Sequence, residues 1–153
     1  MISIIKDVIL PFLPSALTII GWWIVASRDS SSKKNAIHNK RVEAASKLID
    51  KILLDAKKFY SLPGTDAEAK GIRSLLISDF KKLSSIIILI TKELNEVEKQ
   101  SLSVAFIEYK KMVTGGEFET VSRPLISTSN QLYFDIDATY NDLYIELEKT
   151  YLI

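Results

Sequence analysis

The sequence predicts an all-α protein: an N-terminal transmembrane helix followed by a cytoplasmic antiparallel four-helix bundle. Residues 8–26 carry no charged side chain, and the rest of the chain repeats apolar residues at spacings of three and four. Proline and glycine interrupt that repeat only at short connections. The predicted parts are a short tail at 1–7, a transmembrane helix at 8–27, a basic, Ser-rich joint at 28–34 and a helical domain at 35–153.

The uncharged run has the length and the flanks of a membrane span. Nineteen residues of helix rise about 28 Å, close to the hydrocarbon thickness of a bilayer. Trp22 and Trp23 lie near its end, as interfacial side chains do. The alternative is a cleaved signal peptide. Asp7 offsets the single Lys6 before the run, and the run exceeds the usual apolar region of a signal peptide, so a retained anchor is favoured.

Positive charge predicts the orientation of this span. Residues 28–41 hold five Lys or Arg against one Asp, so the positive-inside rule places the following domain in the cytoplasm. We therefore expect a single-pass protein of the cell inner membrane with its N-terminus outside. The basic residues either attract membrane lipid or only set the topology. The residues assigned to the anchor and its lipid interface are Trp22, Trp23, Arg28, Lys33 and Lys34.

Two helices are predicted in the first half of the domain. An apolar stripe begins at Ile37 and ends before Leu62-Pro63-Gly64. Thr65 and Glu68 form a capping-box pattern that starts the second helix. Its seam comprises Ile72, Leu76, Phe80, Leu83, Ile87, Ile90 and Leu94. Residues 84–90, SSIIILI, would suit a strand alone, but the seam continues through them, so a helix is expected.

Two further helices complete the predicted bundle. The third carries Leu102, Ala105, Phe106, Tyr109 and Val113 and ends at Gly115-Gly116. The fourth is expected from about Pro124. Its apolar stripe comprises Leu125, Leu132, Ile136, Tyr140, Leu143, Leu147 and Tyr151. Four amphipathic helices with short connections are typical of an antiparallel bundle.

The sequence offers few residues for catalysis or for holding a cofactor. It lacks cysteine, and its single histidine, His38, is expected to be exposed beside the basic residues, so the usual zinc sites are excluded. There is no glycine-rich phosphate loop and no G-x-S-x-G element. We expect no enzyme and no cofactor. Without a basic stripe in the domain, we also expect no nucleic-acid binding.

Residues 135–146, DIDATYNDLYIE, place oxygen-bearing side chains at the positions of a calcium loop. Tyr140 stands where that loop needs glycine, and Ile136, Tyr140 and Leu143 continue a helical stripe. An acidic helix face is therefore predicted instead of a calcium site.

Residues 111–124, KMVTGGEFETVSRP, allow two interpretations. The glycines cap a helix and Phe118 tucks under the bundle, or the segment is a recognition loop that presents Glu117, Glu119 and Arg123. With the apolar anchor, the basic segment and the helical body, this TGG-acidic-Phe element resembles small, poorly characterised bacterial membrane-anchored proteins. The resemblance implies no known activity.

The last predicted helix combines tyrosines with a net negative charge. Such a face suits docking of a basic partner, although tyrosines of this kind also serve as core residues whose hydroxyls reach the surface. The candidate partner-binding residues are Glu117, Phe118, Glu119, Arg123, Asp137, Asp142, Tyr144 and Glu146.

These observations predict a membrane-anchored, non-catalytic interaction protein. It would bind an unknown protein partner, or self-associate as a homo-oligomer, as a regulator or a defence or exclusion component of bacterial or phage origin. One alternative is a membrane-perturbing effector whose span oligomerises through its small residues, Ser15, Ala16, Thr18 and Gly21. Another is an exported helical sensor domain released by signal-peptide cleavage.

Overall fold

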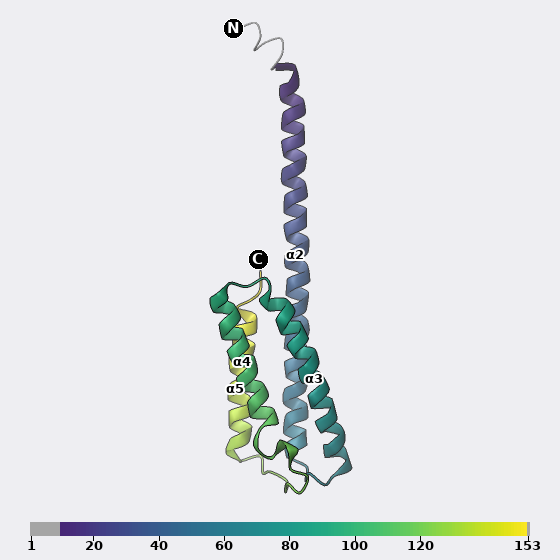
Figure 1. Cartoon of the computed structure of the whole chain (residues 1–153), viewed down its shortest axis with the longest axis vertical. Helices are drawn as coiled ribbons and strands as arrows, with labels where there is room; N and C mark the ends of the chain where they lie inside the picture. Colours follow the sequence, from purple (N-terminus) through teal and green to yellow (C-terminus); the bar gives the residue numbers. More distant parts are fainter. Residues whose placement is uncertain (1–9, 153) are drawn as a thin grey trace. The chain divides into compact units, whose positions relative to one another are not determined.

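The computed structural model describes residues 10–152, with side chains from residue 32 onward, and every regular element in that range is helical (Figure 1). The elements are α2 (Leu10–Tyr60), α3 (Ala67–Thr91), α4 (Glu96–Thr114), the short 3₁₀ helix η2 (Gly116–Glu119) and α5 (Gln131–Glu148). The chain divides into two compact units between residues 37 and 38. The predicted all-helical class is confirmed.

The predicted anchor belongs to the first unit. Among the residues that the structure describes, no helix is long and apolar enough to cross a membrane. The structure describes side chains only from residue 32 onward, so the predicted roles of Trp22, Trp23 and Arg28 fall outside the described residues. Lys33 and Lys34 are described and exposed. The residues of the predicted joint at 28–34 lie within α2, which does not end there. The serines there are not accompanied by glycine or proline, so nothing local ends the helix.

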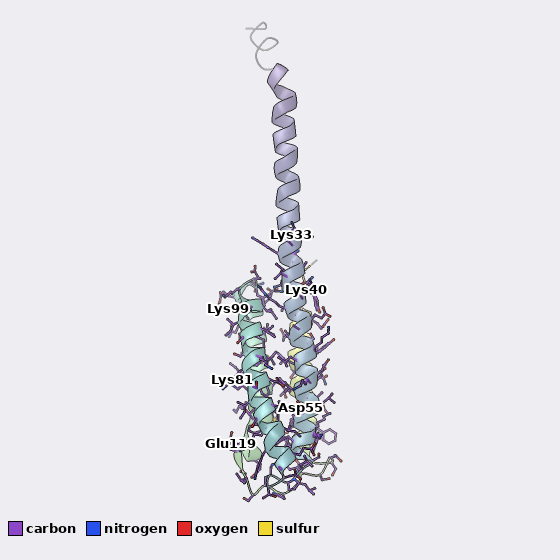
Figure 2. All side chains as sticks on the ribbon, turned by 90° about the vertical axis from the view of Figure 1, so that its right-hand side faces the viewer. Lys33, Lys40, Asp55, Lys81, Lys99 and Glu119 are labelled. Carbon is purple, nitrogen blue, oxygen red and sulfur yellow. The ribbon has the colours of Figure 1, made fainter. Side chains whose placement is uncertain are left out.

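The second unit is a helical bundle. From residue 38 onward α2 lies beside α3, α4 and α5, and successive helices run in opposite directions (Figure 1). Lys99, near the start of α4, and Glu119, after its end, mark the two ends of the bundle (Figure 2). All four helices bury apolar side chains in one core, including Ile49, Leu76, Leu102, Leu143 and others below 2% exposure.

The apolar periodicity of the sequence corresponds closely to the core. Residues 84–90 are helical, as predicted, and α3 buries its predicted seam as far as Ile90. In α4 the five buried residues are the five predicted ones. In α2, Ile37 is 52% exposed, so the stripe enters the core only from Val42 onward.

Short polar side chains determine where the helices begin. Asp66 caps α3, because its carboxylate accepts a hydrogen bond from the backbone N–H of Glu68 at 2.7 Å. The predicted Thr65–Glu68 capping box is therefore wrong; the Glu68 carboxylate pairs with Lys58 at 2.6 Å. Asn95 starts α4 with a complete capping box.

The last helix begins later than predicted. Asn130 caps α5, which starts at Gln131 instead of near Pro124. The preceding residues hold an extended course because the backbone N–H of Ile126 donates to the carbonyl of Tyr60 at 2.9 Å. Leu125 is consequently exposed and does not join the apolar stripe. Residues 135–146 are helical throughout, as the acidic-face interpretation predicted.

A close backbone approach fixes the turn between α2 and α3 against the connection that leads to α5. The N–H of Gly64 donates to the carbonyl of Arg123 at 2.8 Å. A Cβ atom at Gly64 would lie 2.7 Å from the carbonyl oxygens of both Thr120 and Val121. Only glycine allows these two segments to lie so close.

Candidate partner-binding site

The segment after α4 reverses direction at two glycines. Gly116 has a φ of 51°, in the left-handed region that favours glycine, and it leads directly into η2. η2 turns Phe118 inward, where it is 2% exposed and its ring centroid lies 5.0 Å from that of Phe59. Phe118 was among the predicted partner-binding residues; the structure corrects this, because the ring is part of the core.

Arg123 is also buried, with 1% of its surface exposed. Its guanidinium donates to the carbonyls of Phe59 at 3.0 Å and Tyr60 at 3.4 Å, and it lies 4.2 Å from the centroid of the Phe59 ring. Those carbonyls end α2, where backbone oxygens have no partner within the helix and a cation is favourable. Burial lowers the pKa of Arg123 from its ordinary value. Arg123 therefore caps a helix and is not presented to a partner, contrary to the prediction.

The two glutamates of this segment remain at the surface. Glu119 forms an ion pair with Arg73 of α3, which holds η2 against the bundle. The Arg73 guanidinium also lies 5.9 Å from the Phe118 ring centroid. Glu117 is exposed, so the recognition-loop interpretation retains this residue as one that a partner could reach.

A hollow of about 750 Å³ opens beside Glu117, between α4, α5 and the 115–130 connection. Tyr60, Met112, Ile126 and Leu132 contribute its apolar lining. Its charged residues are Glu108, Lys111 and Glu117, and Gly115 and Gly116 complete one edge. Apolar surface with a few charged groups is typical of binding sites for peptides and small molecules.

Burial also affects the tyrosine beside this hollow. Tyr60 is 1% exposed, and its hydroxyl donates to the carbonyl of Val113 at 2.8 Å. Burial raises the pKa of Tyr60 to about 12, because the ionised phenolate would lose its hydration. Tyr60 is therefore uncharged at neutral pH and joins α2 to α4 by a neutral hydrogen bond.

The acidic residues of α5 fall into different surroundings. Asp137 forms an ion pair with Lys57 of α2 at 2.6 Å, and Glu146 pairs with Lys149 at 2.6 Å. Asp142 is exposed, and together with Glu146 it lines a second hollow of about 460 Å³ between α4 and α5. The structure thus brings Asp142 and Glu146 together and places Asp137 elsewhere.

Tyr144 belongs to a tyrosine cluster between α5 and α2. Its ring centroid lies 6.0 Å from that of Tyr140, whose hydroxyl donates to Asp50 of α2 at 2.5 Å. Burial is the largest cause that raises the pKa of Tyr140, followed by its hydrogen bond to Asp50. Tyr144 keeps 36% of its surface exposed. It lies at the edge of the core and still reaches the surface, so a partner could contact it.

His38 differs most from its prediction. It is 1% exposed, and its Nε2 donates to the carbonyl of Thr150 at 2.8 Å. The chain after α5 folds back over the start of the bundle, where the Asn39 side chain exchanges two hydrogen bonds with the backbone of Leu152. The expectation of an exposed histidine was wrong because its partners lie more than a hundred residues away. Within residues 32–152 no group of His, Cys, Asp or Glu side chains is arranged to hold a metal ion.

The predicted partner-binding residues therefore separate into buried and accessible ones. Arg123 and Phe118 stabilise one end of the bundle, and the accessible candidates lie on η2 and α5. Sequence reasoning missed Glu108, Lys111 and Met112, although their four-residue spacing places Glu108 and Met112 on one face of a helix. The chain matches no known family model, and no curated protein or solved structure is detectably similar to it.

Proposed function

We propose that this chain is a membrane-anchored, non-catalytic interaction protein whose helical domain binds a protein partner. The observation that supports this function best is the hollow of about 750 Å³ between α4, α5 and the 115–130 connection. Its volume falls within the range of about 300–1,000 Å³ that is usual for pockets that hold small molecules, so side chains of a partner would fit into it. Exposed Glu117 and Lys111 at its edge would orient the partner.

The membrane part of the proposal is supported by the sequence. The uncharged run at 8–26 would form a single span, and Trp22, Trp23 and the basic residues after it would lie at the lipid interface. The excess of positive charge after the run favours a cytoplasmic domain at the inner membrane. A small anchored protein without catalytic residues would fit a role as a regulator, or as a defence or exclusion component.

A photo-crosslinking experiment in living cells tests where the chain acts. A photo-reactive residue replaces Met112 in the hollow, and a matched variant carries it at Ile88, which is 57% exposed on α3. We expect discrete protein adducts at position 112 and none at position 88. The adducts should persist when residues 8–26 are replaced by an unrelated transmembrane helix. Equal adducts at both positions, or their loss in the exchanged chain, would contradict action through the domain.

The anchor is tested separately. The chain should remain in the membrane pellet after carbonate extraction, and a reporter fused to its C-terminus should be active only in the cytoplasm. A mature chain that begins near Arg28 would instead support an exported domain.

A second candidate function is a membrane-perturbing effector whose span oligomerises. The small residues Ser15, Ala16, Thr18 and Gly21 favour it, because they let helices approach closely. In that case Gly21→Leu should abolish the effect of the chain on cells, and the exchanged span should be inactive. A span without charged residues to line a pore makes this the weaker candidate.

A further inference from the structure

Two hollows follow one another along the surface between α4 and α5. The first, of about 750 Å³, lies near the end of α4, and the second, of about 460 Å³, lies nearer its start. Glu108 lines both of them. Because α4 and α5 are antiparallel neighbours (Figure 1), the two hollows form one groove along the pair. We call it the α4–α5 groove.

The groove is long enough for a helix of a partner. It extends along α4 at least from Val97 to Met112. At 1.5 Å per residue this stretch is about 22 Å, or roughly four helical turns. Recognition of a helix in a groove between two helices needs apolar side chains at one-turn spacing along such a length.

Large apolar side chains are left in water along this groove. Val97 is 75% exposed, Val104 is 46% exposed, and Ile145 on the opposite wall is 52% exposed. Met112 continues the apolar lining in the first hollow. Covering such side chains is favourable by about 25 cal/mol for each Å² of apolar surface removed from water. Methionine adapts its shape to different partners.

The charges along the groove are mostly negative. Four carboxylates line the two hollows, against a single lysine, Lys111. Glu146 is neutralised in part by Lys149. Within the described part of the chain, Glu108, Glu117 and Asp142 form no ion pair. A partner that brings lysine or arginine would supply the missing charge, whereas an acidic partner would be repelled.

We propose that the α4–α5 groove binds a basic amphipathic helix, with apolar side chains on one face and lysine or arginine on both sides of that face. This inference rests on the proposed function, since it specifies the chemistry of the partner. The apolar face would cover Val97, Val104 and Ile145, and the basic residues would pair with Glu108 and Asp142. The proposed site thereby combines Asp142 and Glu146 of α5, which the sequence analysis identified, with Glu108 of α4, which it did not.

Binding of a designed peptide to the full-length chain in a neutral detergent tests this inference. The probe is a fluorescent helix of leucine and lysine, about 18 residues or five turns long. Its control replaces every lysine by glutamate. Fluorescence anisotropy should show at least about tenfold tighter binding of the basic peptide, because the groove is acidic.

Matched charge variants locate the binding site. Glu108→Lys and Asp142→Lys should each weaken binding of the basic peptide by about tenfold. Glu93→Lys makes the same change of charge at an exposed residue outside both hollows, and its affinity should stay within about twofold of the original. All three changes lie at the surface, so the melting temperature should hardly move. Equal losses of affinity in all three variants would overturn the proposal, because general attraction between charges would then explain the binding.

A matched apolar pair tests the other half of the site. Val104→Gln should weaken binding several-fold, and Leu54→Gln, on α2 and 69% exposed, should not. A photo-reactive residue at Val104 should cross-link to the peptide. If it instead joins two copies of the chain, with no effect of added peptide, the groove is a self-association surface and the proposal is wrong.

The two proposals fail in different ways. Peptide binding in detergent does not depend on the membrane span, and the adducts at position 112 in cells do not depend on the charge of the partner. Adducts that are lost on exchange, together with intact peptide binding, would reject the proposed function and keep the groove. Persistent adducts without selective peptide binding would reject the groove alone.

Discussion

At each end of the bundle, a buried side chain donates a hydrogen bond to a backbone carbonyl at the end of a helix. At one end the Arg123 guanidinium donates to the carbonyl of Phe59, and at the other the His38 imidazole donates to the carbonyl of Thr150. Both carbonyls belong to the last turn of a helix or directly follow one, where backbone oxygens lack partners within the helix. Each buried side chain was expected at the surface, and each satisfies a backbone group far away in the sequence.

The difference between these ends lies in what surrounds the buried nitrogen atoms. Arg123 is stacked on the rings of Phe59 and Tyr60, with its guanidinium 4.2 Å and 5.0 Å from their centroids. His38 depends on hydrogen bonds of the C-terminal residues, which Asn39 holds through Leu152. Each side chain leaves one buried nitrogen without a partner, Nε of Arg123 and Nδ1 of His38.

The chemistry of these two nitrogens is unequal. In arginine, Nε always carries a hydrogen, so an unpartnered Nε is a donor that has lost its water. In a neutral histidine that donates from Nε2, Nδ1 carries no hydrogen and loses only a possible acceptor bond. The Arg123 guanidinium has two aromatic rings and two carbonyl acceptors around it, whereas the His38 imidazole has one carbonyl acceptor. We expect the arginine end to be the more sensitive of the two.

The largest effect should come from a change between the two ends. Leu83 is fully buried on α3, and Leu83→Asp would place a charge in the core without a partner. We expect a loss of about 4 kcal/mol or more in the free energy of unfolding. The bundle should then unfold as a whole, with the contacts at both of its ends. Circular dichroism should show loss of helix. Ile88→Asp, at an exposed position of the same helix, should retain the helix content. Unchanged helix content in Leu83→Asp would show that Leu83 does not contribute to the core.

Replacement of Arg123 tests the first end. Arg123→Ala removes the guanidinium donor from the Phe59 and Tyr60 carbonyls and also removes the stacking, so we expect a loss of about 2–4 kcal/mol in urea denaturation. Arg123→Lys keeps the charge but not the planar fork, and should recover less than half of that loss. Full recovery by lysine would mean that charge alone matters there. Glu117→Ala, nearby and exposed, is the control and should be nearly neutral.

These two buried side chains also show how far the sequence could predict the fold. Periodicity predicted the seam of α3 through Leu83 and the face of α4 with Tyr109, because those contacts repeat every turn. It could not predict the burial of Arg123 or His38. Their partners are 64 and 112 residues distant, and neither side chain is apolar, so a repeat of apolar residues does not identify them.

The candidate site was predicted only in part, for a related reason. Asp142 and Glu146 were identified from their charge on one helix. Glu108 was not, because its position in the groove depends on which helix packs beside α4. The late start of α5 was missed because residues before Asn130 are held by the Tyr60 carbonyl, a contact between distant segments.

Alkaline pH should weaken the arginine end more than the histidine end. The pKa of Tyr60 is raised to about 12 from an ordinary value of 10.0, so this residue stabilises the fold fully below pH 10. As the pH rises from 10 to about 12, the unfolded chain releases the proton first, and stability falls by about 2 kcal/mol. Melting curves of the Tyr60→Phe variant should be flatter over this range. If the melting temperature falls equally with pH in the original chain and in Tyr60→Phe, groups other than Tyr60 cause the loss of stability.

The smallest effect is expected at the histidine end. Asn39→Ala removes both hydrogen bonds to Leu152 and should cost about 1 kcal/mol. Hydrogen exchange should show faster exchange of the backbone N–H of Leu152, while α3 stays protected. Asn141→Ala, an exposed change on α5, is the control. Faster exchange throughout the bundle would mean that this end is as important to the whole fold as the other.

The close approach at Gly64 also limits which sequences this fold accepts. Any side chain there would meet the carbonyl oxygens of Thr120 and Val121, which are backbone atoms and cannot turn aside. Gly71, in the exposed part of α3, has no atom within 4 Å of a built Cβ, so most residues would fit it and favour the helix. A library of substitutions selected for folding should therefore retain only glycine at position 64 and lose it readily at position 71. Gly64 and Gly71 are only seven positions apart, yet we expect the first to tolerate no substitution and the second to tolerate most.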